Sequence, residues 1–424
     1  MSERSFKPRH GEIASTTATM LAGVFAIAFA GVMTLAVLMR AASPLAGAEL
    51  AGGDSGVPDF AAAAPTLASV LGAGADSQGF SRVEGPRAFS FPKDHGAHPD
   101  YRAEWWYFTG NLRAADDRHF GWQFTLFRFG LPRDAQAPVA QPSVAKSVWY
   151  DGNLYMAHFA LTDTAGGVFH AFERFARPPA ASASTAAEVA ESSMFSGWLD
   201  DWSLRFDGNT WRVRARDGAV AIDLAAQPET PILLQGDAGF SVKGAAPGNA
   251  SHYYSVPRLR TRGSVRTPVG SFVIEGISWL DREWSTSALE PGQRGWDWFA
   301  LQLADGRDLM FYRLRRNDGA TDPHSAGVFV RPDPAGGRQI ERLFAKDVML
   351  EPARFARIGT ARYPVAWRLR LPEAALQSAL WVEARLPDQL HRGVFPYWEG
   401  AVVVREGGPR GPRIGEGYVE LTGY

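Results

Sequence analysis

The chain has 424 residues, with 44 Lys and Arg, 45 Asp and Glu and a formal net charge of −1. It is long enough for two domains with substantial cores, and it lacks a basic field that would attract nucleic acid, so we expect no nucleic-acid partner. Because it contains no Cys, disulfides, thiolate metal sites and Cys nucleophiles are excluded.

The N-terminal segment contains an apolar run from Ala18 to Met39 that follows several basic residues. A run of this length can cross a bilayer, so we expect residues 1–40 to form either a retained transmembrane anchor or a signal helix cleaved near SPLAGA at 43–48. In both cases the positive-inside rule predicts that the bulk of the chain is periplasmic or otherwise extracytoplasmic, anchored in the inner membrane or secreted. Residues 41–85 are rich in Ala, Gly, Pro and Ser and are typical of a flexible linker.

The remaining sequence consists of short alternating runs with turn signals between them, and helix-period stretches are scarce. Asp217-Gly218 and Asp305-Gly306 each lie between two alternating runs, which predicts two hairpins. Pro257 marks an edge or a bulge in a further strand. We therefore predict an all-β fold with two antiparallel domains, either β-barrels or strongly curved sheets, at 86–264 and 265–424, divided where the pattern breaks near Arg262 to Pro268.

The stretch from Phe91 to Asn111 concentrates charged and aromatic residues at the start of this region. Read with period two, Glu104 and Trp106 share one face of a strand, whereas Trp105 and Tyr107 share the other, so both faces are expected to be covered. Two interpretations remain open: a buried structural pair such as Glu104 with Arg128, or a pocket rim. For the second, the candidate substrate-binding residues are Asp94, His95, His98, Glu104, Trp106 and Arg128. The H-x-x-H pair in this loop is a weak metal signal, and we predict no metal.

Common catalytic motifs are missing: the sequence has no G-x-S-x-G elbow, no H-E-x-x-H helix and no Walker A loop. The best candidate site combines two runs. His252 and Tyr254 share a face of one strand, and Trp279 and Asp281 share a face of the next. If these faces meet, one wall holds an imidazole, two aromatic rings and a carboxyl group. The alternative is an ordinary structural His–Asp pair.

Six segments of the chain form a distinctive set: FPKDHGAHPDYRAEWWYFTGNL (91–112), GWQFTLFR, HYYS, WLDREWS, YWEGAV and GEGYVELTGY (415–424). Together they resemble the carotenoid 1,2-hydratase family, also called the AttH or CrtC type, which includes predicted secreted hydrolases. The resemblance spans roughly 86–424 and implies two lipocalin-like β-barrels. Its hydratase site pattern falls on His252, Tyr254, Trp279 and Asp281, although the carotenoid hydratases tend to have Trp at the position of Tyr254 and Tyr at that of Trp279.

This resemblance implies water addition to an alkene at an isoprenoid end, a hydro-lyase reaction without a cofactor. As a hypothesis, Asp281 is the acid, with its pKa raised by an apolar pocket. Tyr254 and Trp279 stabilise the cation, and His252 orients or deprotonates the water. The alternative is a passive carrier of a carotenoid, isoprenoid or lipid ligand that works at the membrane with an ABC-type transport complex. A hydrolase is the third reading, although no nucleophile is recognisable.

Overall fold

The computed structural model describes residues 79–131, 152–176, 195–286, 289–372 and 375–424, which all belong to one compact unit. Helical structure in these ranges is limited to two 3-10 turns, η1 (Lys93–His95) and η2 (Ala345–Asp347), and every other regular element is a strand. The predicted all-β class is therefore confirmed. Neither described turn has the length or apolarity needed to span a bilayer. The predicted anchor or signal helix and most of the predicted linker lie outside the described residues.

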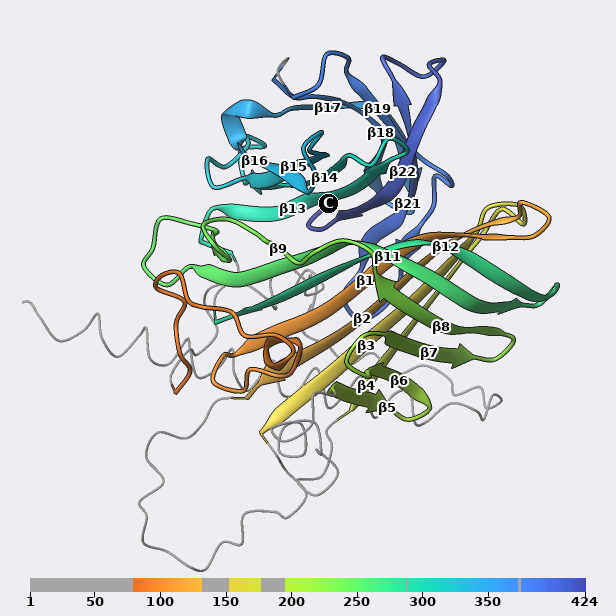
Figure 1. The fold of residues 1–424 in the computed structure, drawn as a ribbon, viewed down its shortest axis with the longest axis horizontal. Coiled ribbons are helices and arrows are strands. Elements are labelled where there is room, and N and C mark those ends of the chain that lie inside the picture. Colours follow the sequence, from red (N-terminus) through yellow and green to blue (C-terminus); the bar gives the residue numbers. More distant parts are fainter. Residues whose placement is uncertain (1–78, 132–151, 177–194, 287–288, 373–374) are drawn as a thin grey trace, which may run out of the picture. The chain divides into compact units, whose positions relative to one another are not determined.

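The first sheet is 12-stranded in the described ranges and antiparallel, with the order β4-β3-β2-β1-β12-β11-β8-β7-β6-β5, while β9 and β10 pair with β11. Figure 1 shows β1, β12 and β11 running side by side. Asp217 pairs with Val220, which confirms the first predicted hairpin. The strands are β1 (Ala103–Ala114), β2 (His119–Gly130), β3 (Asn153–Asp163), β4 (Val168–Ala176), β5 (Phe195–Leu199), β6 (Trp202–Phe206), β7 (Trp211–Asp217), β8 (Val220–Pro228), β9 (Leu233–Leu234), β10 (Phe240–Val242), β11 (Ala250–Thr267) and β12 (Gly270–Ser285).

The second sheet is 10-stranded in the described ranges and antiparallel, with the order β16-β15-β14-β13-β22-β21-β19-β18-β17, while β20 pairs with β21. Gln302 pairs with Asp308 across the Asp305-Gly306 turn, which confirms the second predicted hairpin. The strands are β13 (Gln293–Leu303), β14 (Asp308–Arg316), β15 (Ala326–Pro332), β16 (Arg338–Phe344), β17 (Met349–Ile358), β18 (Ala361–Arg370), β19 (Leu380–Ala384), β20 (Leu390–His391), β21 (Tyr397–Glu406) and β22 (Arg413–Leu421).

Both sheets are curled, and each has a hydrophobic core of its own. A third core lies where the sheets pack on each other. Strand β1 contributes side chains to two cores, because successive side chains of a strand point to opposite faces of the sheet. Trp106 and Phe108 belong to the core of the first sheet, whereas Tyr107 packs with Trp298 and Tyr418 of the second sheet. Both faces of β1 are therefore covered, as the sequence predicts.

The segment that precedes β1 covers the core of the first sheet. Phe89, Phe91 and Tyr101 are partly buried against this core. The indole Nε1 of Trp106 donates a hydrogen bond of 2.8 Å to the carbonyl oxygen of His95. The loop that the sequence singled out is thus fixed to the strand that follows it.

The predicted domain boundary at 264/265 falls inside β11, which continues to Thr267 and turns directly into β12 of the same sheet. The chain passes from the first sheet to the second between Ser285 and Gln293. Sheet membership alone does not define a domain, so the division at this position stays a prediction.

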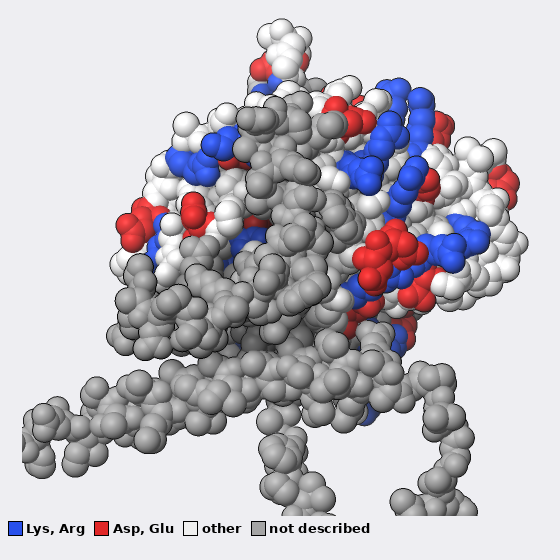
Figure 2. Space-filling view, turned by 90° about the horizontal axis from the view of Figure 1, so that it is seen from below, with Lys and Arg blue, Asp and Glu red and all other residues white. Residues whose placement is uncertain are grey.

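The surface carries both signs of charge. Figure 2 shows Lys and Arg interspersed with Asp and Glu on the described part of one face. Some form exposed ion pairs, such as Arg214 with Asp223 at 3.0 Å and Arg262 with Glu275 at 3.6 Å. Pairs of this kind contribute about 0–1 kcal/mol each, so the fold depends on its cores and on its buried ion pairs.

Candidate functional site

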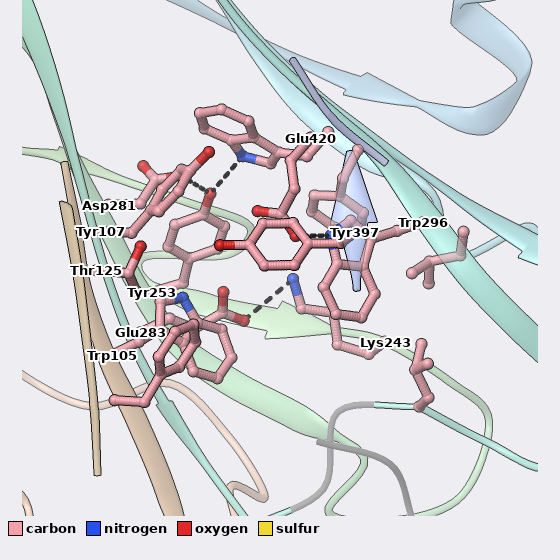
Figure 3. A pocket seen from close by; sticks show the side chains of 15 residues that line it. Trp105, Tyr107, Thr125, Lys243, Tyr253, Asp281, Glu283, Trp296, Tyr397 and Glu420 are labelled. Carbon is pink, nitrogen blue, oxygen red and sulfur yellow. Dashed lines mark hydrogen bonds and ion pairs between the residues drawn. The ribbon is translucent and has the colours of Figure 1, made fainter. Parts of the chain in front are cut away.

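A cavity lies between the two sheets (Figure 3). Strands β1, β2, β11 and β12 form one wall, and β13, β14, β21 and β22 form the other. Indole rings and acid groups are the main features of its lining, and they come from Trp105, Trp296, Trp298, Asp281, Glu283 and Glu420. Apolar ring surface around a few polar groups is typical of sites for small hydrophobic ligands.

Six polar residues lie in one row across the first sheet, each directly opposite the next on the neighbouring strand. From β11 to β4 they are Ser255, Asp281, Tyr107, Thr125, His158 and Glu173. Residues opposite one another on paired strands share a face, so the whole row faces the second sheet. All six side chains are buried. Buried polar groups are costly unless they are hydrogen-bonded, so this row is the strongest sign of a functional site.

Asp281 lies within this row and is 2% exposed. Its Oδ1 accepts hydrogen bonds from Trp279 Nε1 at 2.7 Å and from Ser255 Oγ at 2.5 Å, and its Oδ2 accepts one from the Tyr253 hydroxyl at 2.5 Å. Burial raises the pKa of Asp281 from 3.8 to about 6, because the lost hydration outweighs these three hydrogen bonds, which favour the carboxylate. A fraction of the molecules therefore keeps the proton near neutral pH.

The structure does not bring the four predicted catalytic residues together. Trp279 and Asp281 face the second sheet, whereas His252 and Tyr254 lie on the opposite face of β11, opposite Trp284 and Arg282. The predicted wall of all four residues is therefore wrong. Tyr253, which the sequence analysis did not select, contacts Asp281 instead.

A one-residue shift in the pairing of β11 with β12 causes this difference. Leu259 pairs with Ser278, but beyond Pro257 the register has shifted, so that Ser255 pairs with Asp281. Without the shift Val256 would lie opposite Asp281, and the predicted residues would share its face. A slip of one residue exchanges the two faces of a strand. The bulge predicted at Pro257 is thus confirmed. It places His252 and Tyr254 on the opposite face of the sheet from Trp279 and Asp281.

His252 is buried in the first sheet next to the rings of Phe89, Tyr101 and Trp284. Burial, assisted by the positive charge of Arg87, lowers the pKa of His252 to about 4. The imidazole is neutral at pH 7 and lies on the far side of the sheet from Asp281. The hypothesis that His252 deprotonates a water beside Asp281 therefore does not hold in this structure.

The predicted pocket-rim residues also lie on the first-sheet side. Glu104 is fully buried and forms ion pairs with both Arg128 and Arg282. Burial opposes ionisation, but the two guanidinium groups hold the pKa of Glu104 well below its ordinary value. This arrangement is the structural pair that the sequence left open, extended by a second arginine.

The other predicted rim residues are connected to this pair. The backbone N–H of His98 donates to both carboxyl oxygens of Glu104 at 3.0 Å, and His98 Nε2 lies 3.1 Å from Asp94 Oδ1. His95 Nδ1 lies 2.6 Å from the hydroxyl of Tyr254. Their polar atoms are engaged within the protein, so a substrate-binding role for Asp94, His95, His98, Glu104, Trp106 and Arg128 stays a prediction.

The sequence analysis missed the acid groups of the second wall. Glu420 on β22 accepts a hydrogen bond of 2.9 Å from Trp296 Nε1, and it lies across the cavity from Asp281 in Figure 3. Burial raises the pKa of Glu420 to about 8, and the charge of Asp281 adds to this effect. Glu399, opposite Glu420 on β21, has a pKa raised by burial and by Glu420. The sequence signal for these two acid groups is a glutamate within an otherwise apolar strand, Glu420 in YVEL and Glu399 in YWEGAV.

Lys243 supplies a positive charge at the cavity. Its Nζ lies 3.2 Å from Glu283 Oε1 and 3.8 Å from the ring centroid of Tyr312. Burial would lower the pKa of Lys243, but the charge of Glu283 outweighs it and the pKa is raised. This ion pair places a positive charge beside Glu283, whereas Asp281 and Glu420 at the same cavity have raised pKa values and can hold a proton.

One group of residues in the described ranges has the composition of a metal site. His158, Glu173 and His391 place ligand atoms within 4.8 Å of one another. However, the two imidazole rings stack, with centroids 4.2 Å apart and planes at 27°. The lone pair of an imidazole lies in its ring plane, so two stacked, nearly parallel rings do not converge on one ion. The group fits a hydrogen-bond network better than a metal.

We expect Glu420→Gln to stabilise the protein at alkaline pH. The pKa of Glu420 is raised from 4.5 to about 8, so the folded protein keeps a proton that the unfolded chain releases. Its stability contribution is full below about pH 4.5 and is lost as the pH rises through about 8. Glutamine can still accept from Trp296, so we expect a gain of roughly 1–3 kcal/mol.

Urea unfolding from mildly acidic to alkaline pH measures this gain. Glu351→Gln, on an exposed position of β17, is the matched control and should leave the midpoint unchanged. If Glu420→Gln gave the same small change at every pH, burial of an ionisable Glu420 would be the wrong explanation.

Two curled antiparallel sheets with an acid-lined cavity between them define a lipocalin-like β-protein. The chain belongs to the AttH-like family, whose model matches residues 82–424. It is similar to a protein assigned as an AttH from Nitrosomonas europaea, with 31% identity over 81% of this chain and 100% of that chain and a TM-score of 0.66. Its fold is also similar to that of kievitone hydratase from Nectria haematococca, with 14% identity over 81% and 95% of the two chains and a TM-score of 0.53. No curated protein matches the sequence.

Proposed function

We propose that this protein adds water across a C=C bond of a hydrophobic, isoprenoid-type substrate held between the two sheets, as a carotenoid 1,2-hydratase-like hydro-lyase. The observation that carries the proposal is Asp281, a buried carboxyl group whose pKa is raised to about 6 inside an aromatic-lined cavity. An alkene has no polar atom to bind, so its activation depends on a proton donor that is kept free of bulk water.

The chemistry follows from the residues around Asp281. Its proton passes to one alkene carbon, and the other carbon becomes a tertiary cation. We propose that the rings of Tyr253 and Trp298, which line the cavity and share a hydrogen bond of 3.3 Å beside Asp281, stabilise such a cation. Cation–π contact is worth roughly 2 kcal/mol or more when desolvated. The sequence analysis assigned cation stabilisation to Tyr254, but Tyr254 lies on the other face of β11. Its place beside Tyr253 is taken by Trp298 of β13.

The fold shared with kievitone hydratase supports this proposal at the level of architecture only. We propose that the reaction takes place outside the cytoplasm, because the apolar run at 18–39 would tether or export a chain that acts on membrane-soluble substrates.

Incubation of the full-length protein with lycopene, and separately with a prenylated flavonoid, in heavy-oxygen water tests the proposal. Mass spectrometry is expected to show a product heavier than the substrate by one labelled water, formed in proportion to enzyme and time. Tight binding of both compounds without any product would contradict catalysis on these substrate classes.

A specific observation favours a passive carrier as the second candidate. Both oxygens of Asp281 are already hydrogen-bonded to protein donors, so the carboxyl group could serve only to hold the cavity wall. A carrier would co-purify with a bound lipid and would release that lipid chemically unchanged. It would exchange the lipid with an ABC-type transport complex at the membrane.

A further inference from the structure

We propose that Glu173, His158 and Tyr397 form a proton relay that takes up the proton released by the attacking water. This inference rests on the proposed hydration, and it supplies the base that His252 cannot provide. Tyr397 would be the catalytic residue, since it reaches the cavity, whereas His158 and Glu173 would act through it.

The three side chains form a continuous hydrogen-bonded chain. The Tyr397 hydroxyl lies 2.8 Å from His158 Nδ1, and His158 Nε2 lies 3.2 Å from Glu173 Oε2. All three residues are buried, with His158 at 0% exposure. The backbone N–H of Val394 donates to both oxygens of Glu173, at 3.0 and 3.1 Å. These bonds fix the position of the Glu173 carboxyl group.

The carboxylate determines how His158 carries its proton. Because Glu173 accepts from Nε2, the neutral imidazole keeps its hydrogen there, and Nδ1 is left as an acceptor for the Tyr397 hydroxyl. In this tautomer the phenolic proton points toward His158. The Tyr397 oxygen then keeps lone pairs for the neighbouring Glu399 carboxyl group, which lies within hydrogen-bonding range, and for a water in the cavity. His391, stacked on His158 with centroids 4.2 Å apart, holds the ring in this orientation.

The relay and the acid lie on the same row of the first sheet. His158 is three strands away from Asp281, with Thr125 and Tyr107 between them. Neighbouring strands are about 4.8 Å apart, so the two residues are separated by roughly 15 Å. Tyr397, which belongs to β21 of the second sheet, extends its ring into the space between these two residues, and Figure 3 shows the ring lying across the cavity. Asp281 and Tyr397 both line the cavity, and the proposal places the alkene and the attacking water between them.

The proton balance closes over one turnover. Asp281 gives its proton to carbon, and the C=C electron pair forms the new C–H bond. Water oxygen bonds to the cation and passes one proton to the Tyr397 oxygen, while the phenolic proton moves to His158 Nδ1. The carboxylate of Glu173 stabilises the imidazolium that results. The proton then returns through Tyr397 and cavity water to the Asp281 carboxylate, so no co-reactant is consumed.

Other polar groups of the cavity fit this role less well. Lys243 is a cation paired with Glu283, and a protonated amine cannot accept a proton. Burial raises the pKa of Glu420 to about 8, so that it is mostly protonated at neutral pH. Among these groups Tyr397 is the one whose hydroxyl is backed by an imidazole and a carboxylate.

The first test needs no substrate. Nitrogen NMR of the full chain labelled at histidine distinguishes the two imidazole tautomers, and His158→Gln assigns the signal. We expect His158 in the Nε2–H form, with a shift of its Nδ1 resonance in Tyr397→Phe. An Nδ1–H tautomer of His158, or a His158 Nδ1 resonance that does not shift in Tyr397→Phe, would overturn the relay. This outcome does not depend on which substrate the enzyme uses.

The second test separates protonation from water addition, with lycopene in deuterium oxide as the probe. A cation that is not captured by water loses a proton again, so protonation alone leaves deuterium in recovered alkene. We expect Tyr397→Phe and His158→Gln to lower hydration by roughly 10²- to 10⁴-fold, while deuterium incorporation stays within a few-fold of wild type. Equal loss of both signals, or no loss of either, would contradict the relay.

Matched controls are available outside the cavity. Tyr363 packs on Tyr424 in the second sheet, and His119 is a buried histidine bonded to Thr164 and Asn111. Tyr363→Phe and His119→Gln should keep wild-type hydration. Failure of the proposed function would look different, because wild type itself would then show neither product nor deuterium incorporation. Loss of activity on chelation, with recovery on adding Zn²⁺, would replace the relay with a metal site.

Discussion

Replacing Asp281 with asparagine is expected to lower the hydration rate by roughly 10²- to 10⁴-fold with little change in ligand affinity. The amide has the shape of the carboxyl group and can still accept from Trp279 and Ser255, but it has no proton to give to carbon. Rates of product formation and the dissociation constant of lycopene, measured on the same preparations, separate the two effects. Near wild-type turnover by Asp281→Asn would end the acid assignment.

The pH profile provides a second signature of the same residue. The acid works only when protonated, so activity is expected to fall as the pH rises through about 6, the pKa of Asp281. The Ser255 hydroxyl donates to the carboxylate and so favours the charged form. Ser255→Ala should therefore raise the pKa of Asp281 and move the falling limb to higher pH. A shift to lower pH would mean that another group titrates.

Glu104→Gln is expected to have the largest effect on stability. Glu104 is enclosed by Arg128 and Arg282, and all three side chains have an exposed fraction of 1% or less. Breaking a buried ion pair by removing one partner costs about 3–5 kcal/mol, and here two guanidinium groups lose their counter-charge together. This is a large part of the 5–15 kcal/mol that is typical of folded proteins, so we expect a much lower unfolding midpoint or failure to fold.

The pH dependence of this pair has the opposite sign from that of Glu420. Because the pKa of Glu104 is held well below 4.5, its contribution is present above about pH 4.5 and is lost as the pH falls toward the folded-state value. Urea unfolding of wild type and variant measures both effects. Glu275→Gln, which removes an exposed pair with Arg262, is the control and should change stability little. Equal midpoints for the two variants would refute a structural role for Glu104.

The predicted site fails at one point, the pairing of β11 with β12. Period two correctly puts Trp279 and Asp281 on one face and His252 and Tyr254 on another. The sequence also marks Pro257 as a bulge. It does not show how far the bulge shifts the register, because that depends on the hydrogen-bonded partner strand. The shift brings Tyr253 and Ser255 to Asp281 and directs His252 into the first core.

The second wall of the cavity shows a different difficulty. Glu420 and Tyr397 lie in segments that carried the family resemblance, yet nothing local relates them to Asp281, which is more than a hundred positions earlier. Their proximity comes from the packing of β21 and β22 against the first sheet. The same packing makes their environment dry, and it is dryness that raises the pKa of Glu420.

The sequence by itself determined the all-β class, the two tight hairpins, the covered faces of β1 and the common face of Trp279 and Asp281, because alternation and turn chemistry act over a few neighbouring residues. The tertiary structure alone decided which side chains share a face across strands, and that the cavity lies between the sheets. It also joined Glu173, His158 and Tyr397. Contacts between residues far apart in sequence depend on register and on sheet packing, which are properties of the whole fold.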